Sequence, residues 1–179
     1  DRLLSEVYGK PFQAAIRDAG LRGVMPCYCS IGGLPIHASR HYLTDLLRTE
    51  MGFEGVVVSD YSAVENVYRV QHVGESKGEA GLRCMKAGMD VELPMPSCYN
   101  EEMQARFADG GEEIAVLNRA VLRILEAKFR MGLFENPYAL AGEELKKTVH
   151  HERDDEVSRQ AARGSLLLLI NNGVLPVTG

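Results

Sequence analysis

The chain has 179 residues, of which 45% are hydrophobic and 25% charged, and its formal net charge is −5. This composition is ordinary for a globular protein, and the length suits one domain or slightly more. Basic residues dominate no segment, which argues against nucleic acid as the main partner. No apolar run has the roughly 18 residues that a membrane helix needs, so the sequence does not predict a membrane protein.

Helical and strand-like patterns alternate along the first part of the chain. Residues 1–20 predict a short helix, a break and a second helix. An apolar run of strand length follows at residues 23–28, and a turn-rich loop follows at residues 30–35. Apolar residues at helical spacing then predict a helix that is capped by Ser39 and stops at Gly52.

The next part of the chain repeats this alternation. Three consecutive valines at residues 56–58 predict a strand that is buried on both faces, as in parallel sheets. A polar segment covers residues 61–76, and a helix is predicted over residues 80–88. Residues 89–94 alternate as a strand does, and the spacing of apolar residues over 117–131 predicts a long amphipathic helix.

This order of elements predicts an α/β fold with a parallel sheet. Three strands are too few to close an eight-stranded barrel, so in a barrel fold the chain would form the second half of a TIM-type (β/α) barrel. Residues 1–134 would then be the C-terminal part of the barrel domain. The charged stretch over residues 135–153, which begins near a proline, is predicted to be an interdomain linker.

The last segment, residues 154–179, predicts the start of a second domain. It opens with a helix and continues through five apolar residues, 166–170, which are typical of a buried strand before a turn. The sequence stops nine residues after this strand, which would therefore have no sheet of its own. Because the chain also lacks an initiator methionine, it is expected to be truncated at both ends.

The four cysteines, Cys27, Cys29, Cys84 and Cys98, are expected to be free thiols. Cys27 and Cys29 are separated by one residue, and no second pair completes the spacing of a zinc site. We therefore expect neither a metal nor a cofactor. Free thiols favour a reducing compartment, so a cytoplasmic location is predicted, although the natural N-terminus that would carry a signal peptide is not expected to be present.

Asp60 follows the predicted strand of valines, separated from Val58 only by Ser59. In parallel α/β folds, ligands bind and chemistry takes place at the carboxyl ends of the strands. The local pattern leaves a second interpretation open, in which Asp60 caps the next helix. The flanking sequence favours the first interpretation.

Six motifs occur in an order and at distances that are typical of one enzyme family. They are residues 8–16 with Lys-Pro-Phe, 24–28 (Val-Met-Pro-Cys-Tyr), 31–35 (Ile-Gly-Gly-Leu-Pro), 43–48 (Leu-Thr-Asp-Leu-Leu-Arg), 52–60 (Gly-Phe-Glu-Gly-Val-Val-Val-Ser-Asp) and 87–90 (Ala-Gly-Met-Asp). Over nearly its whole length the chain resembles the family 3 glycoside hydrolases. Residues 161–173 are similar to the start of that family's second domain.

The resemblance implies a TIM-type barrel joined to an α/β sandwich domain, in retaining, exo-acting β-glycosidases. It implies that Asp60, the last residue of the Gly-Phe-x-Gly-x-x-x-Ser-Asp motif, is the nucleophile. A retaining enzyme also needs a second carboxyl group, about 5–5.5 Å away, as acid/base. In the family this group comes from the second domain, beyond Gly179. Glu54, Glu65 and Glu92 are expected to be solvated or structural.

Three more residues are predicted to bind the substrate by this resemblance. Tyr28, of the Met-x-x-Tyr motif, is expected to end its strand beside Asp60 and to donate a hydrogen bond to it, which favours a charged carboxylate. Met25 matches a position near the sugar, and Tyr61 offers an aromatic face where most members carry tryptophan. A half-buried core tyrosine and a core methionine are the alternatives for Tyr28 and Met25.

Histidines are not assigned to the chemistry. His37, His41 and His72 are expected to be solvated rather than catalytic, because histidines on loops and helix faces usually are. The Lys-His pair with which the family binds its substrate lies upstream of residue 1.

The predicted function is hydrolysis of terminal, non-reducing β-linked sugars with retention, through a covalent glycosyl-enzyme on Asp60. The expected partners are small oligosaccharides or aryl and alkyl β-glycosides, homo-oligomer formation is left open, and the isolated chain is expected to be inactive. A non-catalytic carbohydrate-binding remnant of the same fold is the alternative. Aldolase chemistry is disfavoured, because none of the predicted strands ends in a Schiff-base lysine.

Overall fold

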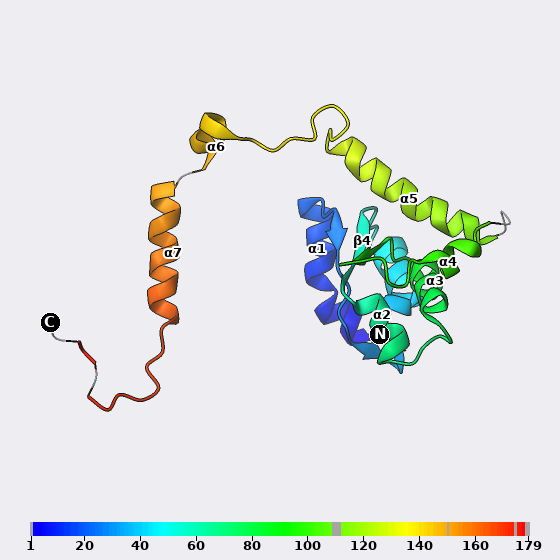
Figure 1. Cartoon of the computed structure of the whole chain (residues 1–179), viewed down its shortest axis with the longest axis horizontal. Helices are drawn as coiled ribbons and strands as arrows, with labels where there is room; N and C mark the ends of the chain where they lie inside the picture. Colours follow the sequence, from blue (N-terminus) through cyan, green and yellow to red (C-terminus); the bar gives the residue numbers. More distant parts are fainter. Residues whose placement is uncertain (1, 109–111, 150, 174, 178–179) are drawn as a thin grey trace. The chain divides into compact units, whose positions relative to one another are not determined.

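The computed structural model describes residues 2–108, 112–149, 151–173 and 175–177, and the chain divides into two units (Figure 1). The first unit comprises residues 1–136, and the second comprises residues 137–179. All strands of the described residues belong to the first unit.

Two consecutive helices open the first unit, as the sequence predicts. They are η1 (Leu4–Tyr8) and α1 (Lys10–Ala19). Gly20 ends α1 with a φ of 61°, a left-handed conformation that glycine adopts without a steric penalty. Ile16 of α1 packs against the hydrophobic core.

A three-stranded parallel sheet forms the centre of this unit and confirms the predicted α/β class. Its strands, in spatial order, are β1 (Gly23–Val24), β4 (Val56–Tyr61) and β5 (Val91–Leu93). The helix η3 (His41–Glu50) lies between β1 and β4 in the sequence, α2 (Ala63–Arg69) and α3 (Lys77–Ala87) between β4 and β5, and α4 (Glu101–Ala105) and α5 (Glu112–Arg130) after β5.

A short hairpin occupies the stretch for which the sequence predicts a loop. β2 (Ser30–Ile31) pairs antiparallel with β3 (Leu34–Pro35), and the 3-10 helix η2 (Ile36–Ala38) follows. Gly32 and Gly33, at the tip, have φ values of 61° and 84°. Two positive φ angles are what a type I′ hairpin turn requires, which explains the glycine pair.

The strand predicted over residues 23–28 is shorter in the structure. Only Gly23 and Val24 pair with β4. Pro26 has no N–H group to donate to a sheet, and within the described residues no strand pairs with the other edge of β1. Cys27 and Cys29 therefore lie in irregular chain, where both are exposed free thiols.

The polar segment predicted over residues 61–76 is also corrected, because it contains the helix α2. Ala63, Val64 and Val67 of α2 are at most 2% exposed. Val64 and Val67 join Val57 of β4 in the hydrophobic core. α2 has only seven residues, so it contains too few apolar positions to show helical spacing among the polar residues that flank it.

A buried ion cluster joins the sheet to η3 and α5. The Asp90 side chain is fully buried, and its Oδ2 accepts hydrogen bonds from Arg48 Nη2 at 2.6 Å and from the backbone N of Val57 at 2.9 Å. Its Oδ1 accepts from Arg123 Nη1 of α5 at 2.8 Å. A buried carboxylate is tolerated only when it is paired and hydrogen-bonded in this way.

The second unit contains α6 (Gly142–Thr148) and α7 (His151–Ser165). The strand predicted over residues 166–170 does not form, and these five apolar residues are 60–83% exposed. A strand requires a neighbour for its backbone groups, and the described residues supply none here. The assignment of residues 154–179 to a second α/β domain stays a prediction.

Candidate active site at the end of strand β4

The carboxyl end of β4 has an irregular register with β5. Val58 pairs with Val91, and Tyr61 pairs with Leu93, so that two residues of β4 lie opposite a single residue of β5. Such a bulge redirects the side chains of the longer strand and occurs often beside active sites. Ser59 and Asp60 are the two residues in this bulge.

Ser59 holds the bulge in place, a role that the sequence analysis did not assign. Its side chain is fully buried, and its Oγ accepts a hydrogen bond of 2.8 Å from the backbone N of Leu93. The backbone N of Ser62 donates to the carbonyl O of Leu93 at 2.9 Å. A hydroxyl within an otherwise apolar strand was the available signal for a structural hydrogen bond.

Asp60 lies inside β4, at its penultimate position, and is half-buried. Its Oδ1 accepts a hydrogen bond of 2.7 Å from the backbone N of Tyr61. Ser62 occupies the N-cap position of α2, so Asp60 does not cap that helix. The carboxylate thus stands at the carboxyl end of a parallel sheet, where α/β enzymes place reactive groups.

Tyr28 lies beside this strand end, as expected, although it is in irregular chain rather than in a strand. Its hydroxyl donates a hydrogen bond of 2.7 Å to the carbonyl O of Tyr61, the residue after Asp60. The hydroxyl also interacts with the side chain of Asp60, the acceptor that the sequence predicts. Desolvation raises the pKa of Tyr28, and the interaction with Asp60 raises it further. The phenol therefore remains a proton donor at neutral pH.

His37 is a buried neighbour of this site, and the expectation that it is solvated is wrong. It belongs to η2 and is 2% exposed, and its ring centroid lies 6.4 Å from that of Tyr28. Burial lowers the pKa of His37 to about 4, although the charge of Asp60 acts in the opposite direction. Within the described residues, Nε2 of His37 has no hydrogen-bond partner. His41 and His72 are exposed, as predicted.

The other two predicted site residues, Met25 and Tyr61, are exposed, at 58% and 64%. Met25 directly follows β1, and Tyr61 ends β4, so both belong to the carboxyl ends of neighbouring strands. Their exposure leaves their side chains accessible to a ligand.

The three glutamates that were expected to be solvated or structural have such environments. Glu92 is buried and accepts hydrogen bonds from the backbone N atoms of Cys98 and Tyr99. Glu65 forms an ion pair of 2.8 Å with Lys77, and the exposed Glu54 lies 3.6 Å from Arg130.

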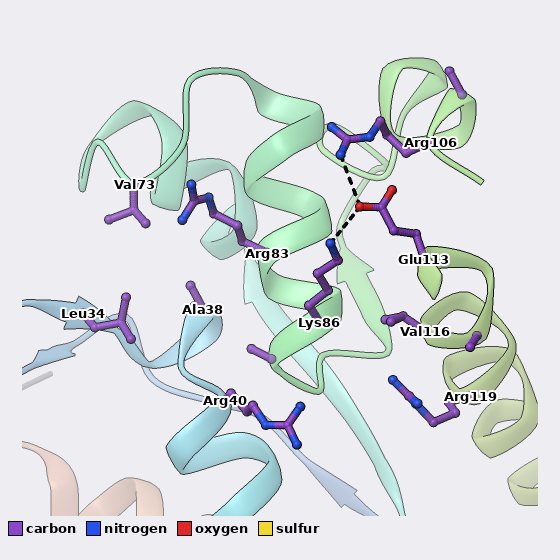
Figure 2. Close-up of a pocket in the computed structure, with 13 residues that line it drawn as sticks. Leu34, Ala38, Arg40, Val73, Arg83, Lys86, Arg106, Glu113, Val116 and Arg119 are labelled. Carbon is purple, nitrogen blue, oxygen red and sulfur yellow. Dashed lines mark hydrogen bonds and ion pairs between the residues drawn. The ribbon is translucent and has the colours of Figure 1, made fainter. Parts of the chain in front are cut away.

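A pocket of about 1030 Å³ lies elsewhere in the first unit, between segments 34–40, α3 and α5 (Figure 2). Its lining residues include none of Met25, Tyr28, Asp60 and Tyr61. It is lined by apolar side chains, by five cationic side chains and by the carboxylate of Glu113. The volume of a pocket therefore does not identify the candidate active site. The side chains at the carboxyl end of β4 identify it.

Comparison with known proteins places this geometry in context. Residues 1–127 match the family model described as Glycosyl hydrolase family 3 N terminal domain. The lysosomal beta glucosidase of Dictyostelium discoideum is 33% identical over 179 residues, which cover 99% of this chain and 22% of that protein. The beta-xylosidase of Formosa agariphila is 31% identical over 185 residues, which cover 99% of this chain and 25% of that protein.

A solved structure shows the same likeness. The beta-glucosidase from Listeria innocua superposes with a TM-score of 0.76 at 32% sequence identity, over 97% of this chain and 24% of that one. This chain thus spans about a quarter of that enzyme and about a fifth to a quarter of its curated relatives.

The relatives do not share one cellular location. The Dictyostelium relative is named lysosomal, and a beta-glucosidase of Salmonella typhimurium, 31% identical over 92% of this chain and 22% of its own length, is named periplasmic. The cytoplasmic location therefore stays a prediction. In the described part of the chain, every helix is too short or too polar to cross a membrane.

Proposed function

The chain belongs to glycosyl hydrolase family 3, as its motifs predict, and we propose that it carries the nucleophile of a retaining β-glycosidase. The N-terminal domain of this family has a TIM-like α/β fold. We propose further that residues 1–134 correspond to the second half of that barrel, because β1, β4 and β5 are parallel and alternate with helices.

The position of Asp60 carries this proposal. It is a half-buried carboxylate in a bulge at the carboxyl end of β4, at the last position of the motif that the chain shares with the family. The bulge is held by Ser59, and the hydroxyl of Tyr28 is bound to the adjacent carbonyl group of Tyr61. The nucleophile is therefore mounted on a rigid strand end, with a phenol beside it.

The reaction follows from the chemistry of a carboxylate at this place. Asp60 attacks the anomeric carbon, and the bond from that carbon to the leaving oxygen breaks while an acid protonates the oxygen. Water then gives a proton to the conjugate base of that acid and attacks the anomeric carbon. The bond from this carbon to Asp60 breaks, the carboxylate is released, and the carbon returns to its original configuration. Tyr28 holds the strand end in position through its hydrogen bond to Tyr61, and its raised pKa keeps the hydroxyl protonated.

The acid/base is proposed to come from another part of the parent protein. Glu92 cannot serve easily, because its oxygens accept hydrogen bonds from the backbone of the loop that follows it. Glu65 is held by Lys77. Glu54 belongs to the segment before β4, at the opposite end of the strand from Asp60.

The proposed substrates are β-linked glucosides or xylosides, with the sugar at the strand ends. Structures of the Listeria beta-glucosidase carry laminaribiose, glucose or isofagomine, which supports a sugar ligand for this family member too. Tyr61 has an exposed aromatic face on which a sugar ring could stack, and Met25 offers an apolar contact.

Chemical rescue of an Asp60 variant tests the proposal in the full-length protein that contains this chain. Asp60→Gly should lower turnover of an aryl β-glycoside about ten-thousand-fold, because the attacking carboxylate is lost. Added azide should restore turnover and yield a glycosyl azide of inverted configuration. Asp18→Gly removes an exposed aspartate of α1 and should retain activity. Undiminished turnover in Asp60→Gly would refute the assignment.

A second measurement separates catalysis from sugar binding alone. A 2-fluoro glycoside that traps the covalent intermediate should add its glycosyl group to the peptide with Asp60, detected by mass spectrometry. Reversible binding of glucose or xylose without such labelling would instead support the non-catalytic remnant.

A further inference from the structure

A cationic recess of about 240 Å³ lies beside the larger pocket of Figure 2 and shares Arg40, Lys86, Val116 and Arg119 with it. Its cationic lining residues are Arg40, Lys86, Arg119 and Arg123, and its neutral ones are Thr44, Met85, Gly88 and Val116. Among these described lining residues there is no carboxylate. Four positive charges thus surround one small volume in a chain whose net charge is −5.

The four cations come from three separate elements. Arg40 directly precedes η3, Lys86 belongs to α3, and Arg119 and Arg123 belong to α5. Figure 2 shows the side chains of Arg40 and Arg119 extending toward each other from opposite sides of the pocket. The fold therefore brings like charges together, and an anion bound between them would lower their mutual repulsion.

Two of these charges are paired at close distance, Arg40 has a long and exposed ion pair, and Arg119 has none among the described residues. Lys86 donates to Glu113 at 2.7 Å, and Arg123 donates to Asp90 at 2.8 Å. Arg40 has only an exposed contact of 3.6 Å with Asp45. Among the described residues, no carboxylate forms an ion pair with Arg119. The donors of Arg40 and Arg119 therefore remain available to a ligand.

We propose that the cationic recess binds a phosphate or sulfate group, with Arg40 and Arg119 as its principal contacts. The planar guanidinium group presents paired donors that match two oxygens of such an anion. The volume of about 240 Å³ suits a free ion or a monosaccharide phosphate, since pockets for larger organic ligands begin at about 300 Å³. The recess contains none of the proposed catalytic residues, so this inference stands apart from the proposed function.

Calorimetric titration of the full-length protein that contains this chain tests the recess. Inorganic phosphate, added at constant ionic strength, should bind saturably, and sulfate should compete with it. Arg119→Ala and Arg40→Ala should each weaken binding about tenfold or more, because each removes charge-assisted hydrogen bonds. Arg119→Lys keeps the charge but loses the paired donors, so it should fall between Arg119→Ala and the wild type.

Arg69→Ala is the matched control, because it removes one exposed cation of α2 that lies outside the recess. It should leave phosphate binding unchanged, and so should Asp60→Gly. Thermal unfolding should show every variant folded, since Arg40 and Arg119 are exposed. If wild-type protein shows no saturable phosphate or sulfate binding, or if Arg119→Ala and Arg69→Ala behave alike, the proposal is overturned.

Glucose 6-phosphate and glucose distinguish the two sources of the anion. Tighter binding of glucose 6-phosphate than of inorganic phosphate would identify a phosphorylated sugar as the ligand, whereas equal binding would identify the free ion. Both results support the recess as an oxyanion site. Binding of glucose and glucose 6-phosphate with the same affinity at this recess would contradict it.

Discussion

Tyr28, His37 and Asp60 interact with one another in the structure, although a hairpin and a complete helix separate them in the sequence. The closeness of Asp60 and Tyr28 could be predicted, because each follows an apolar run and belongs to a recognisable motif. His37 could not be assigned correctly, because its burial depends on how η2 packs on elements distant in the sequence. Ser59 was missed for the same reason, since its hydrogen-bond partner is in β5.

Tyr28→Phe should lower kcat/KM of the full-length protein about fivefold without unfolding it. The substitution removes only the hydroxyl that binds the carbonyl O of Tyr61, and one hydrogen bond of this kind contributes about 1 kcal/mol. Steady-state kinetics on an aryl β-glycoside measures the effect. Tyr8→Phe, at an exposed tyrosine of η1, is the control. Equal kcat/KM values for the two variants would show that the hydroxyl of Tyr28 does not contribute to catalysis.

His37→Gln should reduce the dependence of stability on pH. Burial lowers the pKa of His37 from 6.5 to about 4, so the unfolded chain binds a proton in this range before the folded protein does. The folded protein therefore loses stability as the pH falls below 6.5. Relative to pH 7, this loss amounts to about 2 kcal/mol at pH 5 and should be missing from His37→Gln.

Urea unfolding at pH 7, 6 and 5 measures this difference. His72→Gln, at an exposed histidine, should keep the pH dependence of the wild type. The same pH dependence in both variants and the wild type would show that His37 titrates normally.

At the scale of elements, tertiary packing decided where the predicted helices and strands begin and end. β1 is two residues long because, among the described residues, β4 is its only partner strand and Pro26 follows soon after. α2 forms in a stretch that reads as polar because Val64 and Val67 can reach the core. The parallel order β1-β4-β5 was predictable, since helices of suitable length separate the strands. The bulge at the end of β4 was not, because it depends on the register with β5.

The buried ion cluster around Asp90 connects α5 to the sheet. Substitutions in this cluster should therefore lower the free energy of unfolding by amounts that differ from residue to residue. Asp90→Ala should lower the free energy of unfolding by about 3–5 kcal/mol, because it leaves Arg48 buried without its partner. Arg123→Ala should cost less, about 1–2 kcal/mol, since this side chain is 24% exposed and its loss leaves Asp90 bound to Arg48.

Chemical denaturation of each variant gives these values. Arg130→Ala is the control on the same helix, because its contact with Glu54 is 3.6 Å long and exposed, and it should cost less than about 0.5 kcal/mol. A cost for Arg130→Ala as large as that for Asp90→Ala would show that the cluster does not anchor α5.

At the scale of the whole molecule, the two units differ in how much apolar surface they bury. The first unit has a core that includes Phe53, Val57, Val67 and Met89. In the second unit, by contrast, the described residues are nearly all exposed, including the apolar run 166–170. A contiguous exposed apolar segment of this kind promotes association.

Residues 1–179, produced alone, should therefore self-associate through the apolar run. Replacing both Leu167 and Leu169 by lysine should reduce the apparent mass in sedimentation velocity, because charges interrupt the exposed segment. Leu145→Lys changes a single exposed leucine of α6 and should leave the mass unchanged. Self-association that is insensitive to the double substitution would place the contact elsewhere.

The sequence was sufficient for the family, for the α/β class and for Asp60 and Tyr28 as neighbours, because motifs and periodicity are local properties of the chain. The tertiary structure alone decided that His37 is buried, that Ser59 secures a bulge and that Arg40, Lys86, Arg119 and Arg123 surround one recess. Burial, register and charge compensation depend on residues that are far apart in the sequence. They arise only when η2 packs on α3, β4 pairs with β5, and α3 packs on α5, so no local pattern records them.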